Sequence, residues 1–244
     1  MVHSFSLSPD DISVDAVGRL WVTARQQNLL VGMDGGGGAL RTETISGGPE
    51  GVASDGATLY VAQQDRNAVV AVTPAIRTYI TFPNRTPNAG IDGLYVDSVN
   101  HRLLVPDSPV GELFAVSLAG LPNPQLLGSG LGRPVAAAAD AAGNVFVASE
   151  SSPGLTMILP SGATRTVGHF ANIDEVVAYA GLLYVTELDR HDVLAVDPST
   201  GDSVPVATDL PSPQGLAVTA SGILEIVDAT LNTVYSMPAC GVAP

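Results

Sequence analysis

The chain contains no lysine and a single cysteine, and these two scarcities exclude particular kinds of chemistry. Without a lysine amine, the protein cannot form a Schiff base with a carbonyl substrate. Cys240 has no second cysteine with which to form an internal disulfide. It lies close to the end of the sequence, so we expect an inert thiol rather than a catalytic nucleophile.

Positive charge is also scarce, because 10 arginines face 24 aspartates and glutamates and give a formal net charge of −14. A surface of that sign repels phosphate backbones and anionic membranes, so we expect neither nucleic acid nor a membrane as a partner. The charge fits a bound metal or a small neutral organic substrate. No apolar run reaches the ~20 residues of a membrane-spanning helix. We expect a monomer and see no signal peptide, which leaves the compartment open between cytoplasmic and secreted.

A repeated pattern of strands and turns fills the rest of the sequence. A hydrophobic triplet recurs six times at intervals of 38 to 44 residues, at 20–22, 59–61, 103–105, 145–147, 183–185 and 224–226. Each triplet lies among short segments rich in Val, Ile and Tyr that turn residues separate, and no segment has a sustained helical period. A repeat of this length, built only from strands and turns, predicts a β-propeller.

The second repeat shows all four expected strands, at 51–54, 58–63, 67–73 and 76–82. The sixth repeat offers three, at 214–219, 223–228 and 233–237. The N-terminal segment 3–7 alternates polar and apolar residues, so we expect it to supply the missing outer strand and close the ring. The sequence therefore predicts an all-β fold with residues 1–244 as a single domain. That domain is a six-bladed β-propeller with four antiparallel strands per blade and an N-terminal strand that closes blade six.

The inner strands of a propeller begin around a common axis. In most repeats of this chain, the residue expected at the start of the inner strand is acidic. The six residues are Asp10, Glu50, Asp92, Pro134, Asp174 and Gln214. Carboxylates about 5 Å apart repel one another by roughly 3 kcal/mol per pair at an effective dielectric near 20. Such a ring needs a cation, a proton or a basic partner.

Oxygen ligands favour Ca²⁺, Mg²⁺ or Mn²⁺ over zinc. We therefore predict a divalent cation, Ca²⁺ in the first place, with its ligands drawn from Glu50, Asp92, Asp174, Asp10 and Gln214. Two alternatives stay open. The acids could only cap turns at the rim of the channel, or a protonated acid pair could work without a metal.

Three further residues are candidates for proton transfer. His169 lies in the loop that leads to Asp174, where a neutral imidazole can act as a general base, although packing beside Phe170 is the alternative. Glu175 follows Asp174 directly. Glu225 takes the place that aromatic residues or leucine hold in the other repeats. Either it faces solvent beside the closing strand, or it is a buried acid with a raised pKa and a functional role.

Two segments, 49–56 and 91–97, resemble the inner-strand motif of six-bladed propellers of the regucalcin, gluconolactonase and strictosidine synthase group. Residues 15–22 are equally similar to NHL-repeat and streptogramin-lyase propellers. The resemblance covers the whole chain as architecture and specifies the fold better than the reaction. In the lactonase members, Glu, Asn and Asp side chains hold a divalent cation on the axis. Carried over by position, the ligands here would be Glu50, Asp92 and Asp174, with Asp10 and Gln214 as additional ones, and the asparagine ligands are absent.

The resemblance implies three possible functions. The leading one is a divalent-metal-dependent lactonase or esterase-type hydrolase, with His169 or Glu175 moving the proton. The second is a metal-free cyclase of specialised metabolism, strictosidine synthase-like or pericyclic, with Asp174 or Glu225 as the acid. The third is a non-catalytic NHL-type binding propeller. The streptogramin lyases fit less well, because no Glu-x-His pair occurs and the chain is too short for seven blades.

Overall fold

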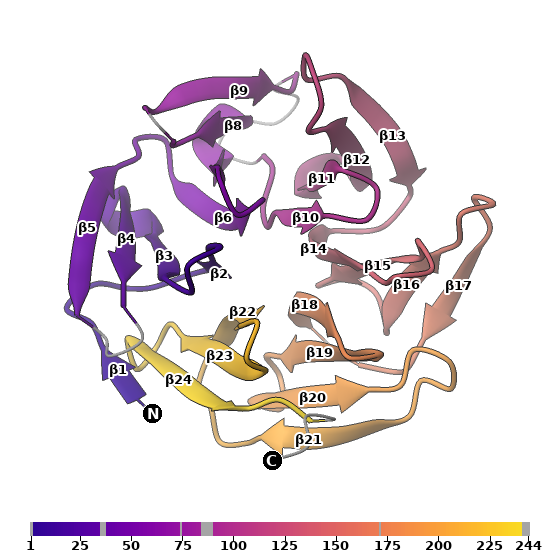
Figure 1. Cartoon of the computed structure of the whole chain (residues 1–244). Coiled ribbons are helices and arrows are strands. Elements are labelled where there is room, and N and C mark those ends of the chain that lie inside the picture. The colour runs from indigo at the N-terminus through magenta and orange to yellow at the C-terminus, as the bar shows by residue number, and fades with distance from the viewer. Residues whose placement is uncertain (1, 35–37, 74, 84–89, 171, 241–244) are drawn as a thin grey trace.

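The computed structural model describes residues 2–34, 38–73, 75–83, 90–170 and 172–240. Within them, 24 strands form six separate sheets of four strands each, and Figure 1 shows these sheets arranged as a ring around an axis. Paired strands are antiparallel in all six blades. The prediction of a six-bladed β-propeller is confirmed.

In blades 1 to 5 the strands run from the axis to the rim in chain order (Figure 1). Blade 1 contains β2 (Ile12–Val14), β3 (Leu20–Ala24), β4 (Leu29–Met33) and β5 (Ala39–Thr44). Blade 2 contains β6 (Pro49–Ser54), β7 (Leu59–Gln63), β8 (Ala68–Ala71) and β9 (Arg77–Thr81). Blade 3 contains β10 (Tyr95–Asp97), β11 (Arg102–Asp107), β12 (Glu112–Ser117) and β13 (Pro124–Ser129).

Blades 4 and 5 repeat the same order. Blade 4 contains β14 (Pro134–Ala139), β15 (Val145–Ser149), β16 (Leu155–Ile158) and β17 (Thr164–Val167). Blade 5 contains β18 (Ile173–Tyr179), β19 (Leu182–Glu187), β20 (Asp192–Val196) and β21 (Ser203–Ala207). The strands that the sequence predicts for blade 2 agree with the observed ones to within two residues at each end.

Blade 6 joins the two ends of the chain. Its inner three strands are β22 (Pro213–Val218), β23 (Ile223–Asp228) and β24 (Thr233–Pro238), and its outer strand is β1 (Val2–Ser4). β1 lies antiparallel to β24, with Val2 opposite Tyr235 and Ser4 opposite Thr233. The predicted closure of the ring by an N-terminal strand is confirmed, although the strand covers Val2–Ser4 rather than the whole of 3–7.

Burial follows the distance of each strand from the rim. Every residue of β3, β7 and β15 is buried, because these second strands lie inside a sheet whose two faces pack against neighbouring blades. The outer strands β9, β13 and β21 are largely exposed. The hydrophobic core is therefore a set of layers between blades, and the axis itself is left for other side chains.

Short loops on one face of the ring fix the start of the inner strands. Three 3₁₀ turns, Arg25–Gln27, Gln64–Arg66 and Ser108–Val110, follow the second strands of blades 1 to 3. Each ends in a left-handed residue, and Asn28 has φ of 56°. The Asn28 side chain then accepts hydrogen bonds from the Gly47 and Gly48 N–H groups at 3.1 and 3.2 Å. No helix among the described residues is long and apolar enough to cross a membrane.

Backbone hydrogen bonds connect the inner strands of neighbouring blades around the axis. Gly51 N–H donates to the Asp92 carbonyl at 3.2 Å, and Gly93 N–H donates to the Val135 carbonyl at 2.7 Å. A Cβ added at Gly51 or Gly93 would lie 2.6 Å from the accepting carbonyl oxygen. Glycine is thus needed at these two positions, because only a bare Cα allows the strands to come this close.

Candidate functional site

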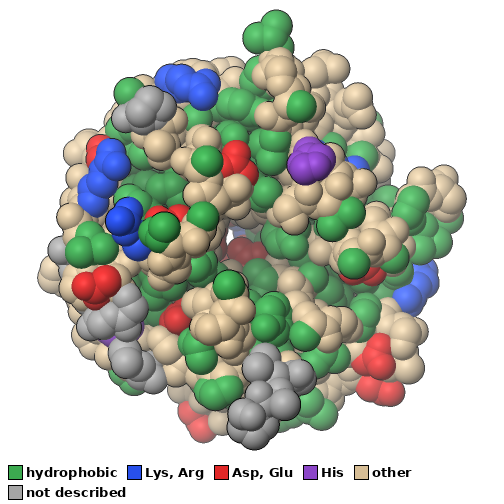
Figure 2. All heavy atoms as spheres, in the orientation of Figure 1, with side chains coloured by type: hydrophobic (Ala, Val, Ile, Leu, Met, Phe, Trp, Pro, Cys, Tyr) green, Lys and Arg blue, Asp and Glu red, His purple; other side chains and the backbone are tan. Residues whose placement is uncertain are grey.

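Carboxyl groups from separate blades surround one cavity of about 100 Å³ on the axis. Figure 2 shows the opening at the centre of the ring, with acidic side chains deep inside it. The acidic and amide side chains that line this cavity, together called the acid cluster below, are Asp10, Asp11, Glu50, Asp92, Glu150, Asp174, Glu175 and Gln214. All five residues that the sequence predicts as metal ligands are among them. The structure therefore brings these residues together, and their role stays a prediction.

A second cavity of about 200 Å³ continues along the axis beyond the acid cluster. Its walls are formed by the inner strands, where apolar side chains such as Ile12, Leu94 and Leu216 alternate with polar atoms. Asp11 and Glu175 line both cavities. These two carboxyl groups therefore mark the boundary between the acidic cavity and this second axial cavity.

Asp11 occupies the position that glycine holds in blades 2, 3 and 6. Its Oδ1 accepts a hydrogen bond from the Ile12 N–H, and its Oδ2 accepts one from the Val52 N–H of blade 2, both at 2.7 Å. The Thr23 hydroxyl accepts a hydrogen bond from the Asp11 N–H at 3.0 Å and donates to the Glu50 carbonyl at 2.6 Å. Asp11 is thus fixed by backbone donors and is only 8% exposed.

Glu175 is the corresponding residue of blade 5 and is held in the same way. The Val176 N–H donates to Glu175 Oε1 at 2.7 Å, and the Glu175 N–H donates to the Thr186 hydroxyl at 2.7 Å. A threonine on the second strand therefore supports the acid in both blades. This pairing of an acid with a threonine positions two carboxyl groups at the boundary between the cavities.

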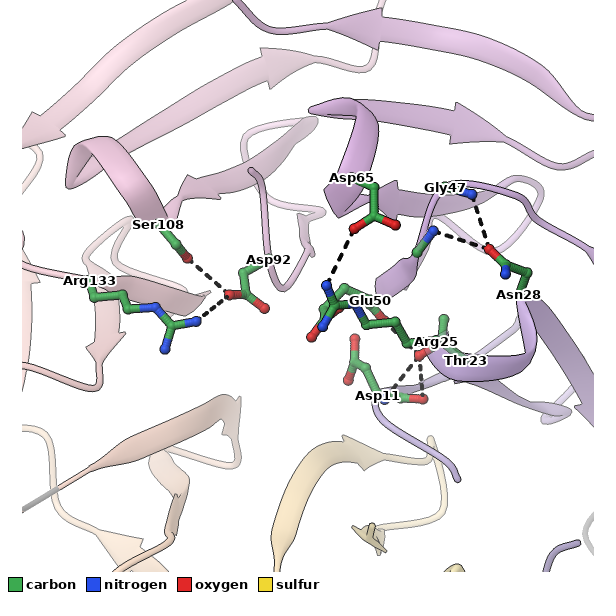
Figure 3. A network of polar contacts seen from close by, with 11 residues as sticks. Asp11, Thr23, Arg25, Asn28, Gly47, Glu50, Asp65, Asp92, Ser108 and Arg133 are labelled. Carbon is green, nitrogen blue, oxygen red and sulfur yellow. Dashed lines mark hydrogen bonds and ion pairs between the residues drawn. The ribbon is translucent and has the colours of Figure 1, made fainter. Parts of the chain in front are cut away.

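Arginines contact the cluster from the side of blades 1 to 4 (Figure 3). Arg25 Nε lies 2.8 Å from Glu50 Oε2, and Arg133 Nη2 lies 3.8 Å from Asp92 Oδ2. Arg133 also forms an ion pair with Glu150. Both arginine side chains are about half exposed, at 41% and 50%, so solvent screens them.

Asp10 of blade 1 and Asp174 of blade 5 have no such compensation. Within the described residues, no arginine forms an ion pair with Asp10 or Asp174. Asp10 Oδ2 and Glu50 Oε2 are buried and have no hydrogen-bond partner unless one of these two carboxyl groups holds a proton and donates it to the other. Of the residues that line the acidic cavity, seven are carboxylic acids and Arg133 is the one cation. The acid cluster is therefore short of positive charge.

Burial raises the pKa of every titratable member of the cluster for which a shift is resolved. It raises the pKa of Asp92 to about 6, of Asp11 to about 7, and of Asp10 and Asp174 to about 8. The pKa of Glu50 rises to about 10, through burial and then through repulsion by Asp10. Burial also raises the pKa of Glu175 well above its usual range. Several of these groups therefore hold protons near neutral pH unless a cation replaces them.

The donor atoms of the cluster suit a hard divalent cation, because all of them are oxygens. As the side chains lie, no three His, Cys, Asp or Glu residues of the described part of the chain are grouped as ligands of one ion. An ion on the axis would have to draw the carboxylates inward. Asp10 Oδ2 is an atom that such an ion would satisfy.

The three residues predicted to move protons lie in different places. Glu175 belongs to the acid cluster. His169 is exposed and lines neither axial cavity, whereas its neighbour Phe170 is 3% exposed. Glu225 is 5% exposed rather than solvent-facing, and it lines a separate cavity between blades 6 and 1. The structure therefore does not bring His169 or Glu225 to the predicted metal ligands.

The sequence analysis left out Asp11, Arg133 and Glu150. A signal for Asp11 was present, because Asp10-Asp11 and Asp174-Glu175 put a second acid where blades 2, 3 and 6 have glycine. Glu150 directly follows β15, as Arg25 follows β3, so the repeat also places it on this face of the ring. Nothing in the repeat pattern marks Arg133.

Comparisons with known proteins identify the fold but no family. No protein-family model matches the chain, and no curated protein matches its sequence. A solved structure of a streptogramin B lyase has a TM-score of 0.70 at 11% identity, over 97% of each chain. Virginiamycin B lyase from Staphylococcus aureus has a TM-score of 0.67 at 12% identity, over 98% of this chain and 89% of that one. A chain of a nidogen/laminin complex has a TM-score of 0.72 at 18% identity, over 80% of this chain and 78% of that one.

At these identities the likeness concerns the fold alone. The similar structures include lyases of the kind that the sequence analysis sets aside. They do not single out the regucalcin, gluconolactonase and strictosidine synthase group that the inner-strand motif resembles.

Proposed function

We propose that this chain is a hydrolase of small neutral lactones or esters and that its reaction depends on a divalent cation held by the acid cluster. The observation that carries the proposal is the convergence of seven carboxyl side chains on one cavity in which Arg133 is the one lining cation. Burying so many acids is unfavourable unless protons or cations compensate them. A bound cation would compensate the charges of these buried carboxylates.

The proposed ligands are Asp10, Glu50, Asp92, Asp174 and Gln214. Among these, Asp10 and Asp174 come first, because no arginine of the described residues pairs with them. Glu50 and Asp92 already contact arginines and would offer their remaining oxygens. When bound, a divalent cation polarises a carbonyl and lowers the pKa of water.

The residues at the boundary of the two cavities would carry the proton transfers. A substrate whose hydrocarbon part lies in the second axial cavity, against side chains such as Ile12 and Leu94, would present its carbonyl beside Asp11 and Glu175. Two backbone donors hold Asp11 in place, whereas Glu175 accepts one N–H through Oε1. Glu175 is thus less constrained by the backbone, and once a bound ion has displaced its own proton it would take a proton from water and return it to the leaving oxygen.

The size of the second axial cavity limits the substrate. Its volume of about 200 Å³ is smaller than the ~300–1,000 Å³ of sites that hold drug-sized ligands. The walls would keep bulk water away from the acyl group and hold it in one orientation. The proposal therefore names a compact lactone or short-chain ester.

An assay of hydrolysis with and without divalent ions tests the proposal. Chelator-treated protein should be inactive on a panel of small lactones and p-nitrophenyl esters, and added Ca²⁺, Mn²⁺ or Mg²⁺ should restore activity. Asp174→Asn should abolish the restored activity. Asp202→Asn, which makes the same change on an exposed turn, should leave it intact. Activity on none of these substrates with any of the ions would contradict the proposal.

A metal-free acid catalyst of the cyclase type is a second candidate. It is favoured by the raised pKa values, which leave carboxyl groups such as Glu50 protonated near neutral pH and able to donate a proton. The absence of a preformed ligand group among the described residues agrees with it. This candidate predicts an activity that a chelator does not change and that Asp174→Asn still lowers.

A further inference from the structure

The junction between blades 6 and 1, where the two ends of the chain close the ring, contains a cavity that the axial site does not use. Its volume is about 610 Å³, larger than either axial cavity. The lining residues from blade 1 are Ala16, Val17, Gly18 and Leu20, and those from blade 6 are Thr219, Ala220, Ser221, Ile223, Glu225, Ser236, Met237 and Pro238. We call this space the seam cavity. It lies at the end of β2 away from Asp10 and Asp11, and so on the face opposite to the acid cluster.

One residue that lines the seam cavity departs from the repeat. The central residues of the second strands in blades 1 to 5 are large and at most 5% exposed, namely Trp21, Tyr60, Leu104, Phe146 and Tyr184. Glu225 stands at the same step, opposite Ala217 and Ser236, as Tyr184 stands opposite Val177 and Ala195. A glutamate fills less of the space between blades than an aromatic ring does. Volume that other blades fill with a side chain is therefore left open here.

Glu225 gives the cavity its chemical character. It is the one charged residue among those that line the cavity, and most of the others are apolar. The Ser236 hydroxyl donates to Glu225 Oε2 at 2.5 Å. Burial raises the pKa of Glu225, against the hydrogen bond from Ser236 and the charge of His3. Within the described residues, no arginine forms an ion pair with it.

We propose that the seam cavity binds a small apolar molecule that carries a protonated amine. The ammonium group would donate to Glu225 and add a charge-assisted hydrogen bond to a carboxyl that has His3 nearby but, within the described residues, no arginine ion pair. The apolar part would pack against Val17, Leu20, Ile223 and Met237, in the space that a ring fills in the other blades. Repulsion by the same carboxylate would exclude an anion of equal size, and a neutral alcohol would lose the charge-assisted bond.

Three probes of one shape test this site in the full chain: benzylammonium, benzyl alcohol and benzoate, measured by calorimetry and by amide chemical shifts. Benzylammonium should bind at least about tenfold more tightly than either of the others. The shifts it causes should centre on 16–20 and 219–225. Equal binding of the three probes, or shifts centred on the acid cluster, would overturn the proposal.

Two variants separate the seam cavity from the acid cluster, which also attracts cations. Glu225→Gln keeps the size of the side chain and should abolish the preference for the ammonium probe. Asp174→Asn weakens the acid cluster and should leave that preference unchanged. A Glu225→Gln protein that keeps its thermal midpoint and still prefers benzylammonium would contradict the role of Glu225. Should that variant not fold, the ranking of the probes and the shift map on the unaltered chain decide the question.

Discussion

Asp11 Oδ2 of blade 1 accepts a hydrogen bond from the Val52 N–H of blade 2 at 2.7 Å. At the junctions of blades 2 with 3 and 3 with 4, a glycine N–H donates to a backbone carbonyl instead. Between blades 1 and 2, a side-chain carboxylate therefore makes a hydrogen bond that links the inner strands. The same carboxylate lines both axial cavities. Asp11 therefore belongs both to the contact between blades 1 and 2 and to the candidate site, so its substitution affects stability as well as chemistry.

Asp11→Ala is expected to destabilise the fold. It leaves the buried N–H groups of Ile12 and Val52 without acceptors, which costs roughly 1–3 kcal/mol for a lost partner. Asp11→Asn keeps one side-chain oxygen and should cost less. Urea unfolding of both variants measures the difference. An alanine variant as stable as the asparagine variant would show that these hydrogen bonds do not matter.

Stability should fall as the pH rises from about 5 to about 9 in the absence of divalent ions. The folded-state pKa values of Asp92, Asp11, Asp10 and Asp174 lie at about 6 to 8, above the ordinary values of an unfolded chain. The folded protein therefore binds more protons than the unfolded one in this interval, so the free energy of unfolding decreases with pH. This is opposite to the behaviour of a protein whose acids are salt-bridged.

Unfolding free energies from denaturant titrations at pH 5, 7 and 9 check that trend. Ca²⁺ at saturating concentration should recover much of the stability lost at pH 9, because a cation then replaces the protons. A free energy of unfolding that rises between pH 5 and pH 9 would show that the cluster does not hold protons as described.

Removing the arginine beside Asp92 should strengthen cation binding. Arg133 Nη2 lies 3.8 Å from Asp92 Oδ2 and competes with an ion for that carboxylate. The arginine is half exposed, so its screened interaction is worth at most about 1 kcal/mol, and Arg133→Met should raise the affinity about three- to fivefold. Arg165→Met is the matched control, because Arg165 is exposed and its guanidinium donates to the Pro198 carbonyl in the outer part of the ring. Weaker binding after Arg133→Met would mean that Arg133 supports the site rather than competing with the ion.

The close approach of inner strands can be tested at Gly93. A Cβ there would lie 2.6 Å from the Val135 carbonyl oxygen, so Gly93→Ala should cost about 1–3 kcal/mol of stability. Gly128→Ala is a suitable control, since its Cβ would meet the movable end of Ile158 at 3.0 Å. The thermal midpoints of the two variants give the comparison, and equal midpoints would contradict the account of the axis.

The fold was largely readable from the sequence because each blade repeats one pattern. The spacing of the triplets from Trp21 to Glu225 predicts six blades, and the missing fourth strand of the last repeat predicts closure by the N-terminus. The same periodicity located Asp10, Glu50, Asp92, Asp174 and Gln214 at the axis, since residues at equal steps of a ring face a common centre. In blade 4 it was wrong by one residue, because Val135 rather than Pro134 lines the acidic cavity. The repeat alone therefore predicts which side chains lie near the axis in most blades, without any homologue.

What the repeat could not provide are contacts that only one blade makes. Arg133 reaches Asp92 and Glu150 through a loop, and no periodic position marks that loop. Glu225 was recognised as an exception, but its burial depends on how blade 1 packs against blade 6. His169 was placed near the axis by its distance along the chain from Asp174, whereas the structure exposes it. Such features depend on three-dimensional packing rather than on spacing.

A calorimetric titration of Ca²⁺ at pH 7, in two buffers with different ionisation enthalpies, tests the central claim most directly. The account predicts saturable binding of one ion per chain with release of protons, because Asp10 and Asp174, with pKa values of about 8, must lose them to coordinate. Asp174→Asn should weaken binding at least about tenfold, and Asp202→Asn should not change it. No saturable heat, or equal binding by both variants, would contradict a cation site on the propeller axis.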